Sequence, residues 1–252
     1  ADRYQNSFIE GGAFRKMVRL FIFDFDGLII DTETPDLISW QEIFQEYGQE
    51  LPLAIWADCI GARADAFDPH AYLERLLGHA LDRETIRQRR RARFYALVDE
   101  QPLRPGILEY IHEAKRRGIL LSVASSADRK WVGGHLTKRG LIEHFACIKT
   151  AEDVSQAKPA PDLFLAVLRE LSIPADEAIV FEDSPNGLRA AKAAGIFSVA
   201  VPNPTTVSLS LHDADLYTPS LADLPVEKLL EQFAQRKAHR KTTTAPFSES
   251  CT

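Results

Sequence analysis

The sequence predicts an α/β fold, in which a Rossmann-like parallel sheet forms the core and an all-helical cap domain is inserted into it. Short apolar runs of strand length alternate with helical stretches along most of the chain, a pattern typical of a parallel sheet covered by helices. Residues 34–101 break this alternation, because they contain helical patterns and no strand-like run. We therefore expect residues 17–33 and 102–230 to form the core and residues 34–101 the cap.

The elements of the core follow from apolar runs and from helix signals. The first strand is expected within Val18–Phe25, a run rich in β-forming residues that ends in aspartates and a glycine. Pro161 suits the first turn of a helix, and Gly195 is a typical helix stop. The later strands are expected at Leu120–Ala124, Cys147–Lys149, Ala178–Phe181 and Phe197–Val201, and the helices at Ile107–Arg117, Lys130–Arg139, Pro161–Leu171 and Leu188–Ala194.

The cap is expected to begin at Thr34 and Pro35, a helix-start signal that is followed by an apolar stripe up to Tyr47. Because two connections join it to the core, it is a candidate lid over the end of the first strand. Residues 1–16, a leader, and residues 235–252, a polar tail, are expected to be flexible. Further cap helices are expected at Leu53–Cys59, Pro69–Leu77 and Arg83–Val98.

The composition excludes several classes of function. The chain has 252 residues, of which 45% are hydrophobic and 26% charged, as in an ordinary globular protein. Its net charge of -6 argues against nucleic-acid binding, and no apolar run reaches the ~18–20 residues that span a bilayer. Cys59, Cys147 and Cys251 form no CxxC pair, so we expect reduced thiols and a cytoplasmic protein. No obligate protein partner is evident.

Two pairs of acidic residues stand at the ends of predicted strands. Asp24 and Asp26 flank Phe25 before Gly27, while Glu182 and Asp183 end a second apolar run. Because parallel strands end at one edge of a sheet, the four acids can meet there and hold Mg²⁺ or act as nucleophile and acid/base. Either pair alone could instead cap a turn. Their clustering favours a metal, since four acids without a cation would repel one another and raise each other's pKa.

A hydroxyl pair and a lysine complete the set of candidate site residues. Ser125 and Ser126 follow a predicted strand and precede a helix, where hydroxyl and free N–H groups suit a phosphate oxygen. A serine there could equally cap the helix. Lys158 lies in a loop stiffened by Pro159 and Pro161, and its ammonium could neutralise both the acids and a bound phosphate. A solvent-exposed lysine is the alternative.

In their order, Asp24-Phe25-Asp26-Gly27, Ser125, Lys158 and Glu182-Asp183 resemble the four motifs of the haloacid dehalogenase (HAD)-like hydrolase superfamily. The resemblance is closer to its β-phosphoglucomutase/phosphoglycolate-phosphatase-like branch with a helical cap, and it runs from about Val18 to Leu224. It implies that Asp24 is the nucleophile, which forms an aspartyl-phosphate, and that Asp26 is the acid/base.

The resemblance also implies roles for the other candidate residues. Ser125 and Lys158 would be catalytic and, with Ser126, would bind the phosphoryl group. Arg63 lies where caps of this family place a substrate-specificity loop. Mg²⁺ would be held by Asp24, the Asp26 main-chain carbonyl and Asp183, with Glu182 as a ligand or as a neighbour of the ligands.

The implied activity is a Mg²⁺-dependent phosphatase for a small phosphorylated metabolite, such as a sugar phosphate. Asp26 favours phosphate esters, because haloacid dehalogenases and phosphonatases of this superfamily carry no Asp two residues after the nucleophile. A phosphomutase of the β-phosphoglucomutase type is the alternative, but Asp36 stands where those mutases tend to carry a histidine. A non-catalytic binding module is a third hypothesis, and the filled catalytic positions argue against it.

Two further features have ordinary structural explanations. Five arginines between Arg87 and Arg93 could contact an anionic substrate, but such a run is more often a solvated helix face, here near Asp82 and Glu84. Trp131 is expected to be a packing residue.

Overall fold

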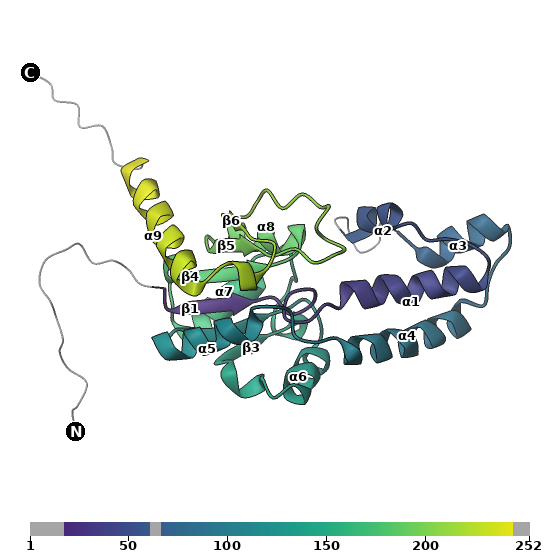
Figure 1. Ribbon diagram of the computed structural model, residues 1–252, viewed down its shortest axis with the longest axis horizontal. Helices are drawn as coiled ribbons and strands as arrows, with labels where there is room; N and C mark the ends of the chain where they lie inside the picture. Colours follow the sequence, from purple (N-terminus) through teal and green to yellow (C-terminus); the bar gives the residue numbers. More distant parts are fainter. Residues whose placement is uncertain (1–17, 61–66, 244–252) are drawn as a thin grey trace, which may run out of the picture.

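The computed structural model describes residues 18–60 and 67–243 of the chain. Its core is a parallel sheet of six strands in the order β3-β2-β1-β4-β5-β6, so the predicted fold class is confirmed (Figure 1). The first strand lies between β2 and β4, which places its end near the ends of both neighbours. The strands are β1 (Leu20–Phe23), β2 (Leu120–Ala124), β3 (Cys147–Lys149), β4 (Ala178–Glu182), β5 (Phe197–Ala200) and β6 (Leu216–Tyr217).

Helices cover both faces of the sheet because successive residues of a strand point to opposite faces. Phe21 and Phe23 of β1 belong to the apolar cluster that contains side chains of α5, α6 and α9. Leu20 and Ile22 belong to the opposite cluster, with side chains of α7 and α8. These helices are α5 (Ile107–Arg117), α6 (Arg129–Lys138), α7 (Asp162–Leu171), α8 (Pro185–Ala193) and α9 (Val226–Thr243), and short 3₁₀ helices lie at Ile142–His144, Ala151–Asp153, Ala175–Glu177 and Leu221–Asp223.

The cap is a helical unit with an apolar core of its own. Trp40 and Phe44 of α1 pack in one cluster with Leu73 of α3 and Ile86 of α4. In Figure 1, α1 and α4 run side by side away from the sheet, and both lead back to it. The two connections are tied together, since the Arg104 N–H donates to the Ile29 carbonyl (3.0 Å). The cap helices are α1 (Glu33–Glu46), α2 (Leu53–Ile60), α3 (Pro69–Leu77) and α4 (Arg83–Glu100).

The structure corrects the expected limits of some elements. The first strand ends at Phe23, so Asp24 lies just past it, and the helix expected from Leu188 begins at Pro185. The sequence does not predict β6, because two half-exposed residues give no periodic signal. Residues 235–252 are expected to be a flexible tail, but helix α9 continues through the first part of this segment to Thr243. The helical part has no glycine or proline and many strong helix formers.

Within residues 18–60 and 67–243, none of the helices is long and apolar enough to cross a membrane.

Candidate active site

The acidic residues meet at the edge of the sheet where β1 and β4 end. Phe23 is paired with Phe181 across these parallel strands, so Asp24 and Glu182 leave the sheet side by side. The Asp24 N–H donates to the Phe181 carbonyl (3.0 Å), which fixes the start of its loop. Asp24, Glu182 and Asp183 are all buried. The strand register therefore brings together two acidic motifs that are far apart in the sequence.

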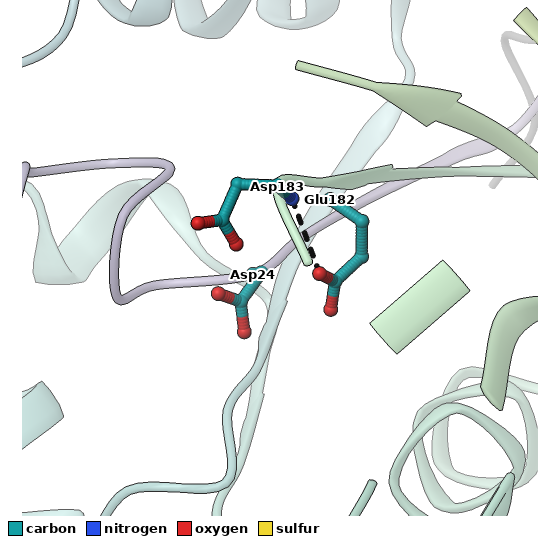
Figure 2. Close-up of side chains that lie close together, drawn as sticks. All are labelled: Asp24, Glu182 and Asp183. Carbon is teal, nitrogen blue, oxygen red and sulfur yellow. Dashed lines mark hydrogen bonds between the residues drawn. The ribbon is translucent and has the colours of Figure 1, made fainter. Parts of the chain in front are cut away.

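The carboxylates of Asp24, Glu182 and Asp183 form a buried cluster (Figure 2). One carboxylate oxygen of each residue lies within 4.8 Å of the other two. Burial, and then the Glu182 and Asp26 charges, raise the pKa of Asp24 to about 8 against the opposing effect of Lys158. Burial and the neighbouring acids also raise the pKa of Asp183 well above its usual value. A hard cation bound by these oxygens would favour their ionised forms, so the three acids are a candidate metal site.

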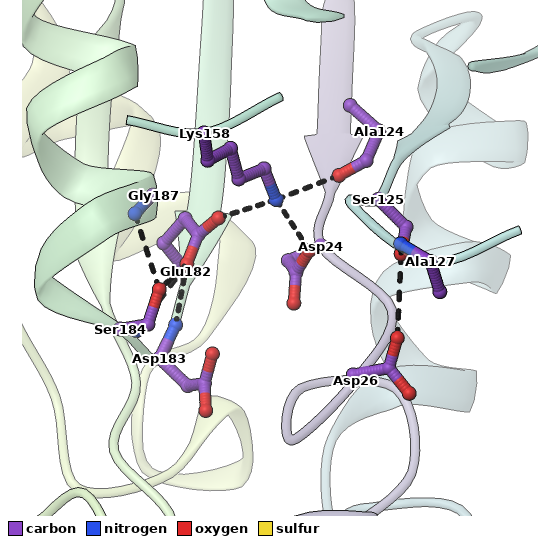
Figure 3. Close-up of polar contacts among 10 residues, drawn as sticks. All are labelled: Asp24, Asp26, Ala124, Ser125, Ala127, Lys158, Glu182, Asp183, Ser184 and Gly187. Carbon is purple, nitrogen blue, oxygen red and sulfur yellow. Dashed lines mark hydrogen bonds and ion pairs between the residues drawn. The ribbon is translucent and has the colours of Figure 1, made fainter. Parts of the chain in front are cut away.

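Lys158 supplies the positive charge of the site. Its Nζ pairs with Asp24 and with Glu182 Oε1 (2.6 Å), and donates to the Ala124 carbonyl (2.8 Å) (Figure 3). Its side chain is only 6% exposed, so it is not a surface lysine. Burial lowers the pKa of Lys158, but the Asp24 and Glu182 carboxylates outweigh this effect and raise it above its usual value. The ammonium is therefore charged and held by three acceptors.

Both oxygens of the Glu182 carboxylate contact the protein. While Oε1 pairs with Lys158, Oε2 accepts from the Ser184 hydroxyl (3.1 Å) and from the main-chain N–H groups of Asp183 (3.2 Å) and Ser184 (3.3 Å). Gly187 leaves room for it, since a Cβ there would lie 1.8 Å from the carboxylate carbon. In contrast, no hydrogen bond or ion pair from the described residues reaches Asp24 Oδ2 or Asp183 Oδ1. These two oxygens can bind a metal, with Glu182 as the third acid of the cluster.

Asn203 holds one of the acids and is absent from the predicted site. Its Oδ1 accepts from the Thr205 N–H (2.9 Å), the Thr205 hydroxyl (2.7 Å) and the Thr206 N–H (3.0 Å). Its amide nitrogen therefore faces Asp183 and donates to Oδ2 (2.6 Å). Asn203 follows β5 at the same sheet edge, and that placement is the signal that could have identified it.

Gly27 permits this close packing. It has φ +77°, and a Cβ there would lie 2.2 Å from Asp183 Oδ2 and 2.6 Å from Asn203 Nδ2. Both the backbone conformation and the space therefore require glycine at this position.

Asp26 faces the opposite side of the site. Its Oδ2 accepts from the Ser125 hydroxyl (3.3 Å), and its Oδ1 accepts from the Trp131 indole N–H (2.8 Å). Burial raises the pKa of Asp26, and the Trp131 hydrogen bond opposes this rise. Asp128, rather than Ser125, caps α6, because its side chain accepts from the Trp131 main-chain N–H (2.7 Å).

These side chains open into one cavity of about 220 Å³. The cap contributes Glu33, which is not among the predicted site residues. Burial and then nearby acids, first Asp36, raise the pKa of Glu33 to about 8. Arg63, a predicted site residue, lies outside the described residues. Glu182 is not part of the cavity lining, but it pairs with Lys158, which is. The lining residues are Asp24, Asp26, Glu33, Ser125, Ser126, Ala127, Lys158, Asp183, Ser184 and Asn186.

Comparison with known proteins identifies the family. The sequence model of the haloacid dehalogenase-like hydrolases matches residues 21–201, which include both acidic motifs and the lysine. The chain belongs to this family. It is 44% identical to YhcW of Bacillus subtilis over 215 residues, which cover 85% of this chain and 97% of YhcW.

Two other relatives of this HAD-like hydrolase have a named activity or a bound ligand. Hexitol phosphatase B of Escherichia coli is 31% identical over 217 residues, or 83% of this chain and 95% of that enzyme. CbbY from Rhodobacter sphaeroides, crystallised in complex with phosphate, is 32% identical to this chain in sequence. The two structures match with a TM-score of 0.63, and the match covers 82% of this chain and 96% of CbbY. The family predicted from the four motifs is confirmed, and phosphatases are among its relatives.

Proposed function

We propose that this hydrolase is a Mg²⁺-dependent phosphatase that acts on a small phosphorylated metabolite, such as a sugar phosphate. One observation carries the proposal: Lys158 holds one oxygen of Asp24, while the other oxygen has no partner among the described residues, in a cavity shared with Asp26 and Ser125. The relatives support it, since one is a hexitol phosphatase and a CbbY variant has been crystallised with xylulose-1,5-bisphosphate.

The proposed reaction has two steps. The Asp24 oxygen that Lys158 holds bonds to phosphorus as the bond to the ester oxygen breaks, which leaves the other Asp24 oxygen for the metal. The ester oxygen keeps the electron pair and takes a proton from Asp26. Asp26 then takes a proton from water, whose oxygen bonds to phosphorus while the bond to Asp24 breaks, releasing inorganic phosphate. Ser125 and Lys158 would bind phosphoryl oxygens, because this chemistry depends on positioning and charge stabilisation.

The donor set fits Mg²⁺, because the three acids of the cluster offer only hard oxygens. The free oxygens of Asp24 and Asp183 would hold it, with Glu182 beside them, and the Asp26 main-chain carbonyl stays a predicted further ligand. When bound, Mg²⁺ would stabilise the negative charge of the transferred phosphoryl group and of the acids.

The phosphomutase alternative has less support. Asp36 occupies the position at which a histidine would favour a mutase, and it pairs with Arg90 of the cap. Its carboxylate is thus engaged inside the cap. We infer hydrolysis rather than transfer back to a sugar.

The test is release of inorganic phosphate from a panel of sugar and alkyl phosphates, in Mg²⁺ and in chelator. We expect turnover that requires Mg²⁺ and that falls at least about a thousandfold in Asp24→Asn. Asp213→Asn is the matched control, because this acid pairs with Lys192 on the surface. Normal hydrolysis by Asp24→Asn would contradict the mechanism. With β-glucose 1-phosphate and a trace of bisphosphate, isomer formation faster than phosphate release would identify a mutase.

A further inference from the structure

We infer that Trp131 is a positioning residue for phosphoryl transfer, which directs the proton of Asp26 to the carboxylate oxygen beside Ser125. This inference rests on the proposed function, in which Asp26 protonates the leaving group. Among the described residues, Trp131 makes no hydrogen bond or ring contact with Asp24 or the acidic cluster, so its effect would act through Asp26.

The hydrogen bond sets the orientation of the proton. The Trp131 indole N–H lies 2.8 Å from Asp26 Oδ1, and an indole nitrogen can only donate. Oδ1 must therefore accept, whereas the Ser125 hydroxyl beside Oδ2 can either donate or accept. The acidic proton of a neutral Asp26 therefore belongs on Oδ2. This second oxygen lies 3.3 Å from the Ser125 hydroxyl, which lines the same cavity as Asp24. The proton is thus placed on the side where the phosphate ester would bind.

Aromatic side chains from both domains fix the indole ring. His135 of α6 meets it edge to face, with centroids 4.2 Å apart. From cap helix α4, Phe94 stacks on it at 5.7 Å and 15°, and Tyr95 lies at 5.6 Å. The ring is therefore held between the core and the cap, and its N–H has little freedom to leave Asp26. Packing alone, as the sequence predicts, explains the ring contacts but not the donated hydrogen bond.

This role predicts a dependence on the leaving group. An alkyl or sugar alkoxide is a strong base, so its departure needs the proton from Asp26. The p-nitrophenolate ion is a much weaker base and leaves with little help from an acid. A misplaced Asp26 should therefore slow the hydrolysis of sugar and alkyl phosphates far more than that of p-nitrophenyl phosphate.

The experiment compares Trp131→Phe with wild type on one sugar phosphate and on p-nitrophenyl phosphate. We expect the ratio of the two kcat values, sugar over aryl, to fall by at least about tenfold, because part of the general-acid contribution is lost. We expect KM to stay close to that of wild type. The ratio is measured in one preparation, so it does not depend on the fraction of folded enzyme.

Trp56→Phe is the matched control. The Trp56 side chain is buried, whereas that of Trp131 is partly buried, and the Trp56 indole N–H has no hydrogen-bond partner among the described residues. The same substitution there removes ring atoms without removing a hydrogen bond, and it should leave the ratio unchanged. If Trp131→Phe does not fold, a benzothiophene side chain at position 131 keeps the indole shape without the donor and gives the same comparison.

The outcomes separate this role from the proposed function. If Asp24→Asn is inactive but Trp131→Phe slows both esters equally, or neither, the role of Trp131 is wrong and the phosphatase stands. If wild type hydrolyses no phosphate ester, or Asp24→Asn is fully active, the proposed function is wrong and this role is overturned with it.

Discussion

The core site and cap helix α4 use charged side chains in opposite ways. In the site, Lys158 is 6% exposed and holds two buried acids. On α4, Arg93 is 46% exposed and pairs with Glu42 of α1. A buried pair is sensitive to the loss of either partner, whereas water screens an exposed pair and leaves it little net effect. The density of charge in a sequence is therefore a poor guide to function.

The arginines of α4 mainly join two cap helices. Arg87 pairs with Glu84 in its own helix, as expected for a helix face. Arg89, Arg90 and Arg93 reach further, because α1 and α4 lie side by side (Figure 1). The contacts are Arg89 with Glu46, Arg90 with Asp36 and Arg93 with Glu42 of α1, and Arg91 with Tyr95 of α4.

The largest effect is expected from Lys158→Met. This change leaves Asp24 and Glu182 buried without their cation, which should lower the free energy of unfolding by about 3–5 kcal/mol. Loss of the charge at the phosphoryl group should also lower kcat by about 10²–10³-fold. Chemical denaturation and phosphate release measure the two effects.

Lys192→Met is the control for Lys158→Met, because Lys192 is 67% exposed and pairs with Asp213 at 2.8 Å. We expect it to change neither quantity measurably. Equal effects of the two substitutions would remove the contrast between buried and exposed charges.

A pair of glycines tests how tightly the site is packed. Gly187→Ala places a Cβ 1.8 Å from the Glu182 carboxylate, so Glu182 must shift away from Lys158. We expect a loss of about 1–3 kcal/mol in unfolding free energy, together with lower activity. Gly133→Ala in α6 meets nothing within 4 Å and should stabilise the protein by about 0.5–1 kcal/mol. Thermal unfolding measures both changes. Equal changes in the stability of the two variants would contradict the prediction that the site is tightly packed around Gly187.

The features that the sequence could predict are those with a local pattern of burial or turn chemistry. The strand Leu120–Ala124 is found as expected, because a short and mostly apolar run indicates burial on both faces of the sheet, and every residue after Leu120 is buried. Asp24 and Lys158 are also found where expected, since each stands in a local motif at the end of a strand or in a proline-stiffened loop.

Other site contacts depend on the folded chain. Trp131 reaches Asp26 across 105 positions of sequence, and no local pattern distinguishes it from a packing tryptophan. Asn203 reaches Asp183 across 20 positions, and its orientation depends on a loop after β5. Sequence patterns record burial and turn chemistry, whereas these hydrogen bonds are consequences of tertiary packing.

A smaller effect on the site is expected from Asn203→Asp. One oxygen can still accept from Thr205 and Thr206, but the other replaces the N–H donor that faces Asp183 Oδ2 and repels it. We expect the affinity for Mg²⁺ to fall by about 10–100-fold, as for other groups that orient a metal ligand. Calorimetric titration with Mg²⁺ measures this directly. An unchanged affinity would show that Asp183 does not need this contact to bind the metal.

The smallest effect is expected from Arg93→Ala. Its partner Glu42 is 37% exposed and remains solvated when the arginine is lost, so no charge is left buried. Unfolding free energy and phosphatase activity should both stay within error of wild type, although the substitution removes a cation from the most arginine-rich part of the chain. A clear loss of activity with unchanged stability would instead assign α4 a role toward the substrate. Lys158 and Arg93 would then both belong to the active site, and the difference in their burial would not separate a functional charge from a structural one.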